Sequence, residues 1–458
     1  MPGSVRSRWV LAAVSMALFC VQIDYFAMNL ALPRMASDLD SNATDLQWVI
    51  SVYMLALGAF MVPAGRIGDI FGRRRALLAG VALFGLASTL CALAPSAGLV
   101  IAFRGLQGVG AALIFPVSIS VLTNAFPAVR AGYAIGLAYG IAGLGNAAGP
   151  LIGGLLTETI GWRWIFWLNV PLTLISLAVG AWSITESSDE TVPRRIDIAG
   201  LALITTGIGL FTLTFDRAPH WGWLSLSTAG AFAFALVVLA AFVFVENRVR
   251  WPLVDLALAR NARFSILVVA GTIANIAYTV TIFLSTMYLQ QVRDLDPLTA
   301  GLVFLGPSVG AALGGALAGR LASGRPVLVM GVTSVLAALS LAALAAANGW
   351  AMYLPALTAC GLTMGLVYAF TTVATQAVVR PERAGEAAGV TLTFLVALAG
   401  VGVAVSGTVL EMLQRAGMST GGAINAILAV LAALLLPAGV VVLLISRSQR
   451  GEATTPTP

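Results

Sequence analysis

The sequence predicts an all-α membrane protein with fourteen transmembrane helices. Of its 458 residues, 59% are hydrophobic and only 10% are charged, whereas an average soluble domain has about 45 to 50% apolar and about 25% charged residues. Uncharged stretches such as 76–103, 264–292 and 326–379 exceed the ~20 residues that a helix needs to cross a ~30 Å hydrocarbon core. They lack the alternating pattern of barrel strands, so their backbone groups must be satisfied within helices.

The first apolar stretch, 9–32, is too long for the core of a signal peptide and contains Asp24, so we expect it to remain as the first helix. The longest polar connection, 186–196, leaves no room for a soluble catalytic domain, an ATP-hydrolysing domain or a nucleic-acid-binding module. The fourteen predicted helices are 9–32, 47–65, 76–94, 98–122, 131–157, 163–184, 196–215, 225–246, 264–289, 298–319, 326–346, 350–376, 384–410 and 423–446.

The arginines give an independent test of this topology, because cytoplasmic loops are rich in basic residues. With the N-terminus inside, 19 arginines fall in cytoplasmic segments, five fall in outer segments and one, Arg104, lies within a helix. We therefore expect a multi-pass protein of the inner (cytoplasmic) membrane with both termini in the cytoplasm. The net charge of +6 follows from this sorting and does not indicate binding to nucleic acid.

A weak internal repeat divides the chain. The loop after the second helix reads GRIGDIFGRRR, and the loop after the tenth reads GRLASGRP, with Ser323 where an aspartate would stand. We expect two similar six-helix halves, the architecture of carriers whose substrate site lies between repeats. The expected segments are an N-terminal half (1–184), a linker with two inserted helices (185–261), a C-terminal half (262–446) and a cytoplasmic tail (447–458).

Four motifs occur in order along these helices: DYFAMNLALP at 24–33, GRIGDIFGRRR at 65–75, RGLQGVGAA at 104–112 and GLGNAAGPLIGG at 143–154. Together with fourteen helices, this ordered set resembles the major facilitator superfamily, specifically its fourteen-helix drug:proton antiporter branch. The segments 161–171 and 197–200 also resemble that branch. The resemblance covers essentially the whole chain and implies a major facilitator fold.

Asp24 is the only acidic side chain that this topology places well within a helix. An ionisable residue there is costly, so a functional role is the default interpretation. Arg104 lies at similar depth; burial favours the protonated carboxyl and a nearby arginine favours the ionised form. The resemblance implies that Asp24 and Arg104 couple transport to protons, and the alternative is an ion pair that only joins two helices. Tyr25 departs from the branch, which usually has threonine there.

The 65–75 loop is expected to form a tight reversal. Gly65 and Gly72 permit close approach, Asp69 can pair with an arginine, and Arg73 begins a run of three arginines. We expect this loop to latch the two halves together in the outward-open state. A positive loop that only sets topology is the simpler interpretation, and both can hold.

Small residues recur at four-residue spacing in the fifth predicted helix, which lets helices approach closely, while a proline bends the helix axis. Helix packing explains most such patterns. Here the pattern resembles the antiporter motif, which implies export rather than import. The residues of this motif are Gly145, Gly149, Pro150, Gly153 and Gly154.

Further polar residues are candidates for a substrate cavity, although structural hydrogen bonding accounts for each equally well. Asp24 and Asn29 lie roughly 140° apart around their helix, so both cannot face one cavity directly. We assign Asp24 to the cavity or to Arg104 and Asn29 to interhelical hydrogen bonding, with the reverse left open. The cavity candidates are Tyr25, Asn29, Asn146, Asn275, Tyr278 and Tyr368.

The leading hypothesis is a proton-coupled antiporter that exports lipophilic drugs or antibiotics by alternating access. The first alternative is a transporter of a specific metabolite or natural product on the same fold, and the second is a membrane enzyme or receptor. We expect no catalytic residues, no cofactor, no metal site and no nucleic-acid partner. The expected partners are a small lipophilic substrate, protons and membrane lipid, with the protein as a monomer.

Overall fold

The structure is a computed structural model that describes residues 2–41, 46, 48–188, 197–249, 252, 257–295, 297–321, 325–380 and 384–452. Within these residues the chain is helical and holds fourteen helices of 20 residues or more. In order, the elements are α1 (Pro2–Asp38), α3 (Trp48–Phe71), α4 (Arg73–Leu93), α5 (Ala97–Ala125), α6 (Ala128–Thr159), α7 (Arg163–Ser183), α8 (Ile198–Trp221), α9 (Leu226–Glu246), the short α10 (Ala257–Arg260), α11 (Ala262–Met287) with its continuation η1 (Tyr288–Val292), α12 (Pro297–Leu321), α13 (Pro326–Ala345), α14 (Trp350–Ala377), α15 (Ala384–Arg415) and α16 (Thr420–Glu452).

The prediction of an all-helical membrane fold is confirmed. Among the described residues, thirteen of the long helices are long and apolar enough to cross a membrane, and α12 contains a shorter apolar stretch, Thr299–Gly315. Several helices extend beyond their predicted ends because polar residues continue the helix outside the hydrocarbon core. As a result, Asp69 lies near the end of α3 and Asp216 in the last two turns of α8, whereas Asp24 lies well inside α1.

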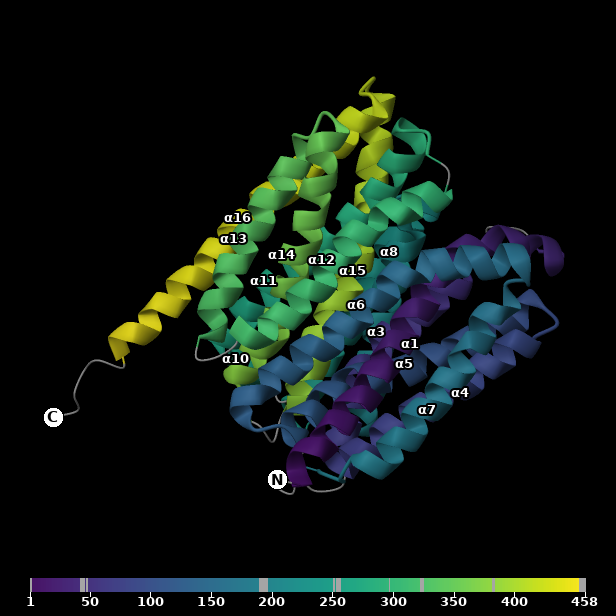
Figure 1. Cartoon of the computed structure of the whole chain (residues 1–458). Helices are drawn as coiled ribbons and strands as arrows, with labels where there is room; N and C mark the ends of the chain where they lie inside the picture. The colour runs from purple at the N-terminus through teal and green to yellow at the C-terminus, as the bar shows by residue number, and fades with distance from the viewer. Residues whose placement is uncertain are drawn as a thin grey trace.

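The helices alternate in direction along the bundle. In Figure 1 the start of α1 and the end of α16 lie toward the same end, which we call the terminal end; the other is the opposite end. The first six long helices share one buried apolar core, and much of the α11–α16 region shares another. Each core combines helices distant in sequence, so neither forms from a local hairpin.

These two groups of helices meet at α6 with α12 and at α3 with α15. Two close approaches lie in the terminal halves of these helices. A side chain added at Gly315 would lie 2.7 Å from the carbonyl oxygen of Gly136, and one added at Gly389 would lie 2.9 Å from that of Met61. Away from this end the purple-to-blue and green-to-yellow helices of Figure 1 diverge.

The α8–α9 pair lies against α3. Ser51 Oγ of α3 donates a 2.9 Å hydrogen bond to Asp216 Oδ1 of α8. The guanidinium carbon of Arg217 lies 3.7 Å from the centre of the Trp48 ring. Charged residues of α8 therefore hold it to the opposite end of α3.

The same helix pair also reaches α15. Trp223, in the turn between α8 and α9, donates a 2.7 Å hydrogen bond from Nε1 to Thr408 Oγ1. The α8–α9 pair is thus bound both to α3, in the first group of helices, and to α15, in the second.

Candidate functional site: a buried carboxylate and its surroundings

The Asp24 carboxylate is enclosed among helices α1, α4, α5 and α7, and its side chain is fully buried. Arg104 Nη1 lies 2.5 Å from Asp24 Oδ2. The other oxygen, Oδ1, accepts hydrogen bonds from Asn169 Nδ2 at 2.7 Å and from Gln107 Nε2 at 3.1 Å. Both carboxylate oxygens are therefore satisfied, as a buried charge requires.

Ser88 of α4 completes this polar cluster. Its hydroxyl accepts a hydrogen bond of 2.7 Å from Gln107 Nε2 and one of 3.2 Å from Asn169 Nδ2. Both amide groups thus bind the serine as well as the carboxylate. Moving any one of these helices changes the environment of Asp24.

Arg104 is held on a second side by α3. Its Nε donates a 3.0 Å hydrogen bond to the carbonyl oxygen of Val49, and its guanidinium carbon lies 4.1 Å from the centre of the Tyr53 ring. Tyr25 stacks on Tyr53, with ring centres 6.1 Å apart. Arg104 Nη2 is buried and has no hydrogen-bond partner among the described residues. The guanidinium thus keeps an unused donor inside the protein.

The sequence prediction that Asp24 and Arg104 lie together is confirmed. Asp24 faces Arg104, which was one of the two orientations assigned to it. The side chain of Asn29 lies outside the described residues, so its assignment to interhelical hydrogen bonding stays a prediction.

The sequence analysis missed four members of this cluster: Ser88, Gln107, Asn169 and Tyr53. Two had a usable signal. Gln107 follows Arg104 by three residues and therefore shares its helix face. Asn169 is an amide inside an otherwise mostly apolar helix, where an unpaired polar group is costly. Ser88 and Tyr53 carry no comparable local signal, because such residues are common in membrane helices.

The turn between α3 and α4 is shorter than expected. Gly65 lies within α3 as regular helix, so its predicted role in the reversal is wrong; the chain turns at Gly72 alone, where φ is +116°. Asp69 Oδ1 lies 2.8 Å from both Nε and Nη2 of Arg73, and both side chains are buried. The electrostatic pair of this motif therefore lies within one six-helix group.

Glu186, which follows α7, binds the start of α4. Its Oε1 accepts a 3.0 Å hydrogen bond from the backbone N–H of Arg74, and its Oε2 accepts one of 3.3 Å from that of Arg75. A carboxylate in this position satisfies helix N-terminal donors and interacts favourably with the helix dipole. The linker after α7 is thereby fixed beside the α3–α4 turn.

The glycines of the α6 motif form the contact with α1. A side chain added at Gly145 would lie 2.8 Å from the carbonyl oxygen of Phe19, and one added at Gly153 would lie 2.6 Å from Ala27 Cα. A side chain added at Gly149 would lie 2.6 Å from Phe26 Cβ. The close approach expected from the spacing is present. Gly154 lies in the same helix, and the side chain of Pro150 lies outside the described residues.

Three of the six cavity candidates gather in one place. Asn275 and Tyr278 of α11 and Tyr368 of α14 line an enclosed cavity of about 10 Å³ together with Met364. Asn275 also donates a 2.8 Å hydrogen bond to the carbonyl oxygen of Leu395, so it has a structural role as well. Of the others, Tyr25 joins the aromatic contacts of the Arg104 cluster and Asn146 lies in α6, apart from this cavity.

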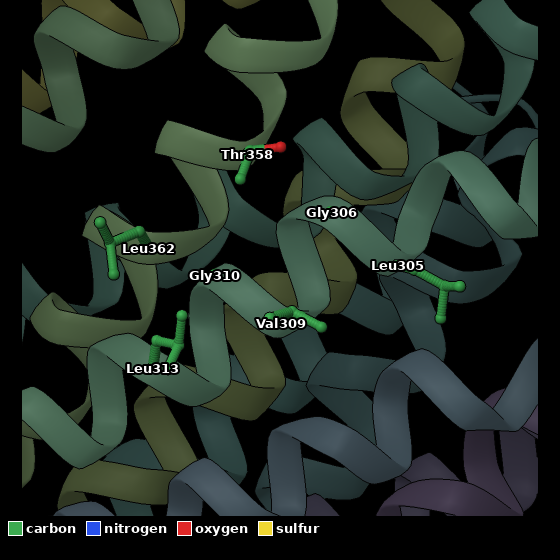
Figure 2. A pocket seen from close by; sticks show the side chains of 7 residues that line it. All are labelled: Leu305, Gly306, Val309, Gly310, Leu313, Thr358 and Leu362. Carbon is green, nitrogen blue, oxygen red and sulfur yellow. The ribbon is translucent and has the colours of Figure 1, made fainter.

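A larger groove of about 420 Å³ lies between α12 and α14 (Figure 2). None of the residues predicted from the sequence lines it. Most of its lining is apolar, with glycines on α12 and leucines on both helices, and Thr358 supplies the one hydroxyl in view (Figure 2). Its residues are Leu305, Gly306, Val309, Gly310, Leu313, Thr358 and Leu362.

Among the described residues, a bundle of long helices, thirteen of them long and apolar enough to cross a membrane, with a hydrogen-bonded ion pair sealed inside one group of six, is typical of a multi-pass membrane transporter. The chain belongs to the Major Facilitator Superfamily, whose family model matches residues 14–259. This confirms the resemblance seen in the sequence motifs and excludes the enzyme alternative.

Known relatives cover most of the chain. It is 31% identical to the tetracenomycin C resistance and export protein of Streptomyces glaucescens, over 91% of this chain and 78% of that one. It is 33% identical to the multidrug resistance protein Stp of Mycobacterium tuberculosis, over 87% of this chain and 75% of that one. The puromycin resistance protein pur8 of Streptomyces alboniger is 33% identical, over 88% and 82% of the two chains.

A solved structure supports the fold. The crystal structure of the human organic anion transporter MFSD10 superposes with a TM-score of 0.68, covering 95% of this chain and 99% of that one at 14% sequence identity. At this level of identity the likeness concerns the fold alone.

Proposed function

We propose that the protein is a proton-driven exporter of lipophilic drugs or antibiotics across the cytoplasmic membrane. One observation carries the proposal: a carboxylate, Asp24, is fully buried within the membrane-spanning bundle and is bound on both oxygens. A membrane protein keeps such a costly charge chiefly where ions or protons move.

The cluster supports a change of protonation during transport. Arg104, Asn169 and Gln107 all donate to Asp24, so the carboxylate is held by donors from two other helices, α5 and α7. Helix movement that separates α1 from α5 or α7 would take these donors away, and a proton on Asp24 would in turn leave at least one donor without an acceptor. The conformation of the bundle and the protonation of Asp24 are therefore linked, which is the requirement for coupling.

The orientation follows from the arginines. Because they concentrate in the loops of the terminal end, that end faces the cytoplasm under the positive-inside rule, and both termini are cytoplasmic. The two six-helix halves come close on this side, at Gly315 with Gly136 and at Gly389 with Met61, which supports an outward-open conformation. A proton arriving from outside would neutralise Asp24 and release the substrate, and its loss to the cytoplasm would reset the carrier.

The substrate class is supported by two facts. The polar candidates in the second half lie among otherwise apolar side chains, an environment that suits a lipophilic molecule. Three relatives over most of the chain's length are named for resistance or export.

The test is a drug-susceptibility panel in a host that lacks its own efflux pumps, comparing the wild-type chain, Asp24→Asn and an empty vector. We expect wild type alone to raise tolerance to several lipophilic compounds. Proteoliposomes then show whether an imposed pH gradient drives substrate movement. Unchanged tolerance, combined with growth on or secretion of one metabolite, would instead identify a dedicated metabolite transporter.

A further inference from the structure

A run of aromatic rings crosses from one half of the bundle to the other. Phe115 of α5 lies 6.4 Å from Tyr139 of α6, and Tyr139 lies 5.4 Å from Tyr368 of α14, measured between ring centres. At ~1.5 Å per residue, Tyr139 lies roughly 17 Å from the terminal end of its helix and Tyr368 roughly 14 Å from that of its own. Both rings are thus near the middle of a ~30 Å hydrocarbon core.

The polar groups around this run are unusually free. The Tyr139 hydroxyl is buried and has no hydrogen-bond partner among the described residues. The hydroxyls of Tyr278 and Tyr368 also make no hydrogen bond to any described residue. Asn275 Oδ1 accepts none from these residues either. A buried hydroxyl without a partner is costly, so Tyr139 needs an explanation, and the partly buried Tyr278 and Tyr368 have hydroxyls free to bind a ligand.

Asn275, Tyr278 and Tyr368 line a small cavity, and Tyr139 reaches it only through its ring contact with Tyr368. The cavity volume of about 10 Å³ is near the minimum for one water molecule. Tyr139 and Tyr368 belong to different halves, so their contact closes the space between the halves. When the halves separate at this level, the phenols face an open site instead of each other.

We propose that Tyr139, Tyr278, Tyr368 and Asn275 form a substrate site for uncharged, planar polycyclic aromatic molecules that carry ring carbonyl or hydroxyl oxygens. The inference rests on the proposed export function and specifies its substrate. Tyrosine rings stack on flat aromatic systems, phenol hydroxyls donate to ring carbonyls, and Asn275 Oδ1 accepts from a ring hydroxyl. The described residues that line the cavity carry no charge, and a charged ligand there would lose its hydration without a counter-charge.

Direct binding to the purified full-length protein tests the site, with three flat probes. Anthraquinone carries two ring carbonyls, anthracene has the same shape without oxygen, and ethidium is a planar cation. We expect anthraquinone to bind at least tenfold more tightly than anthracene. Ethidium binding more tightly than anthraquinone would overturn the proposed chemistry.

Single Tyr→Phe changes locate the site, because they remove a hydroxyl and keep the ring. Tyr139→Phe, Tyr278→Phe and Tyr368→Phe should each weaken anthraquinone binding about fivefold, as expected for one neutral hydrogen bond, and leave anthracene binding unchanged. Tyr368→Leu should weaken both. The matched control is Tyr353→Phe, on the same helix but stacked on Tyr288 instead; it should change neither.

Binding is compared only among variants whose thermal unfolding matches that of the wild type. If Tyr139→Phe folds poorly, Tyr278→Phe alone tests the contribution of a hydroxyl to binding. Unchanged anthraquinone affinity in the folded variants overturns the site. Because binding is measured without a proton gradient, the two proposals fail separately. If anthraquinone binding depends on the hydroxyls but no export follows a pH gradient, the proposed site stands and the proposed function is refuted. If drugs are exported but the hydroxyls have no effect on binding, the proposed function stands and the proposed site is refuted.

Discussion

Asn169 Nδ2 donates a 2.7 Å hydrogen bond to Asp24 Oδ1, so α7 is bound to the same carboxylate whose other oxygen pairs with α5. The carboxylate therefore joins three helices, α1, α5 and α7, through two oxygens. A proton on Asp24 changes an acceptor into a donor and leaves at least one of these contacts without a suitable partner. The predictions below concern this cluster and the features that position it.

Replacing Asp24 with asparagine should abolish proton-coupled efflux while the protein stays folded, because the change removes the titrating group and nearly preserves its shape. The measurement is substrate transport in proteoliposomes as a function of the pH gradient. Detergent-solubilised unfolding serves as the control for folding. Transport at the normal rate and with normal pH dependence would show that Asp24 is not the proton carrier.

Arg104→Ala should slow transport at neutral internal pH, with partial recovery as internal pH rises. The reason is that proton release toward the cytoplasm leaves a carboxylate that Arg104 Nη1 binds at 2.5 Å, and the variant lacks this partner. The change also strands a buried charge, which costs about 3 to 5 kcal/mol when one partner of a buried pair is removed. Melting and transport against internal pH are measured on the same preparation.

The double variant, Asp24→Asn with Arg104→Gln, distinguishes a role of the ion pair in proton coupling from a purely structural role. It should regain most of the stability lost in Arg104→Ala, because no buried charge is left unpaired, yet it should not regain proton coupling. Normal stability together with an unshifted pH profile in Arg104→Ala would leave Arg104 without either role.

Asp69→Asn should shift the conformational equilibrium away from the state in which the terminal end is closed. The change removes the charge that pairs with Arg73 Nε and Nη2 and orders the α3–α4 turn, so a latch that depends on this turn weakens; a loss of about 1 kcal/mol alters a population ratio about fivefold. Spin labels on the terminal ends of α5 and α12 report the distance between halves. The native cysteines are buried, so introduced sites carry the labels; an unchanged distance distribution would exclude the latch.

Gly153→Ala should lower the melting temperature, because the new Cβ would lie 2.6 Å from Ala27 Cα, which belongs to the α1 backbone and cannot rotate away. Overpacking of this kind costs about 1 to 3 kcal/mol. Gly58→Ala is the matched control: it also lies within a helix, has nothing within 4 Å of the added Cβ, and should gain slightly from alanine's helix propensity. Equal melting temperatures for the two variants would contradict the close α1–α6 contact.

The sequence predicted the helices and the central ion pair because both depend on strong local terms. Hydropathy marks each span, and a charge such as Asp24 inside an apolar run requires a partner. It did not predict Ser88 or Tyr53, whose roles depend on which helices pack together and in what rotation. It also placed the 65–75 reversal over too many residues, because helix α3 continues to Phe71 and the positive φ falls at Gly72 alone.

The attachment of the α8–α9 pair to both Ser51 of α3 and Thr408 of α15 restricts how the molecule can rock. The opposite ends of α3 and α15 cannot move apart while the α8–α9 pair stays rigid and keeps both hydrogen bonds. Such a change in separation requires that one of the two hydrogen bonds break or that the turn containing Trp223 bend. The α8–α9 pair therefore limits how far the opposite ends of α3 and α15 can separate while both hydrogen bonds hold.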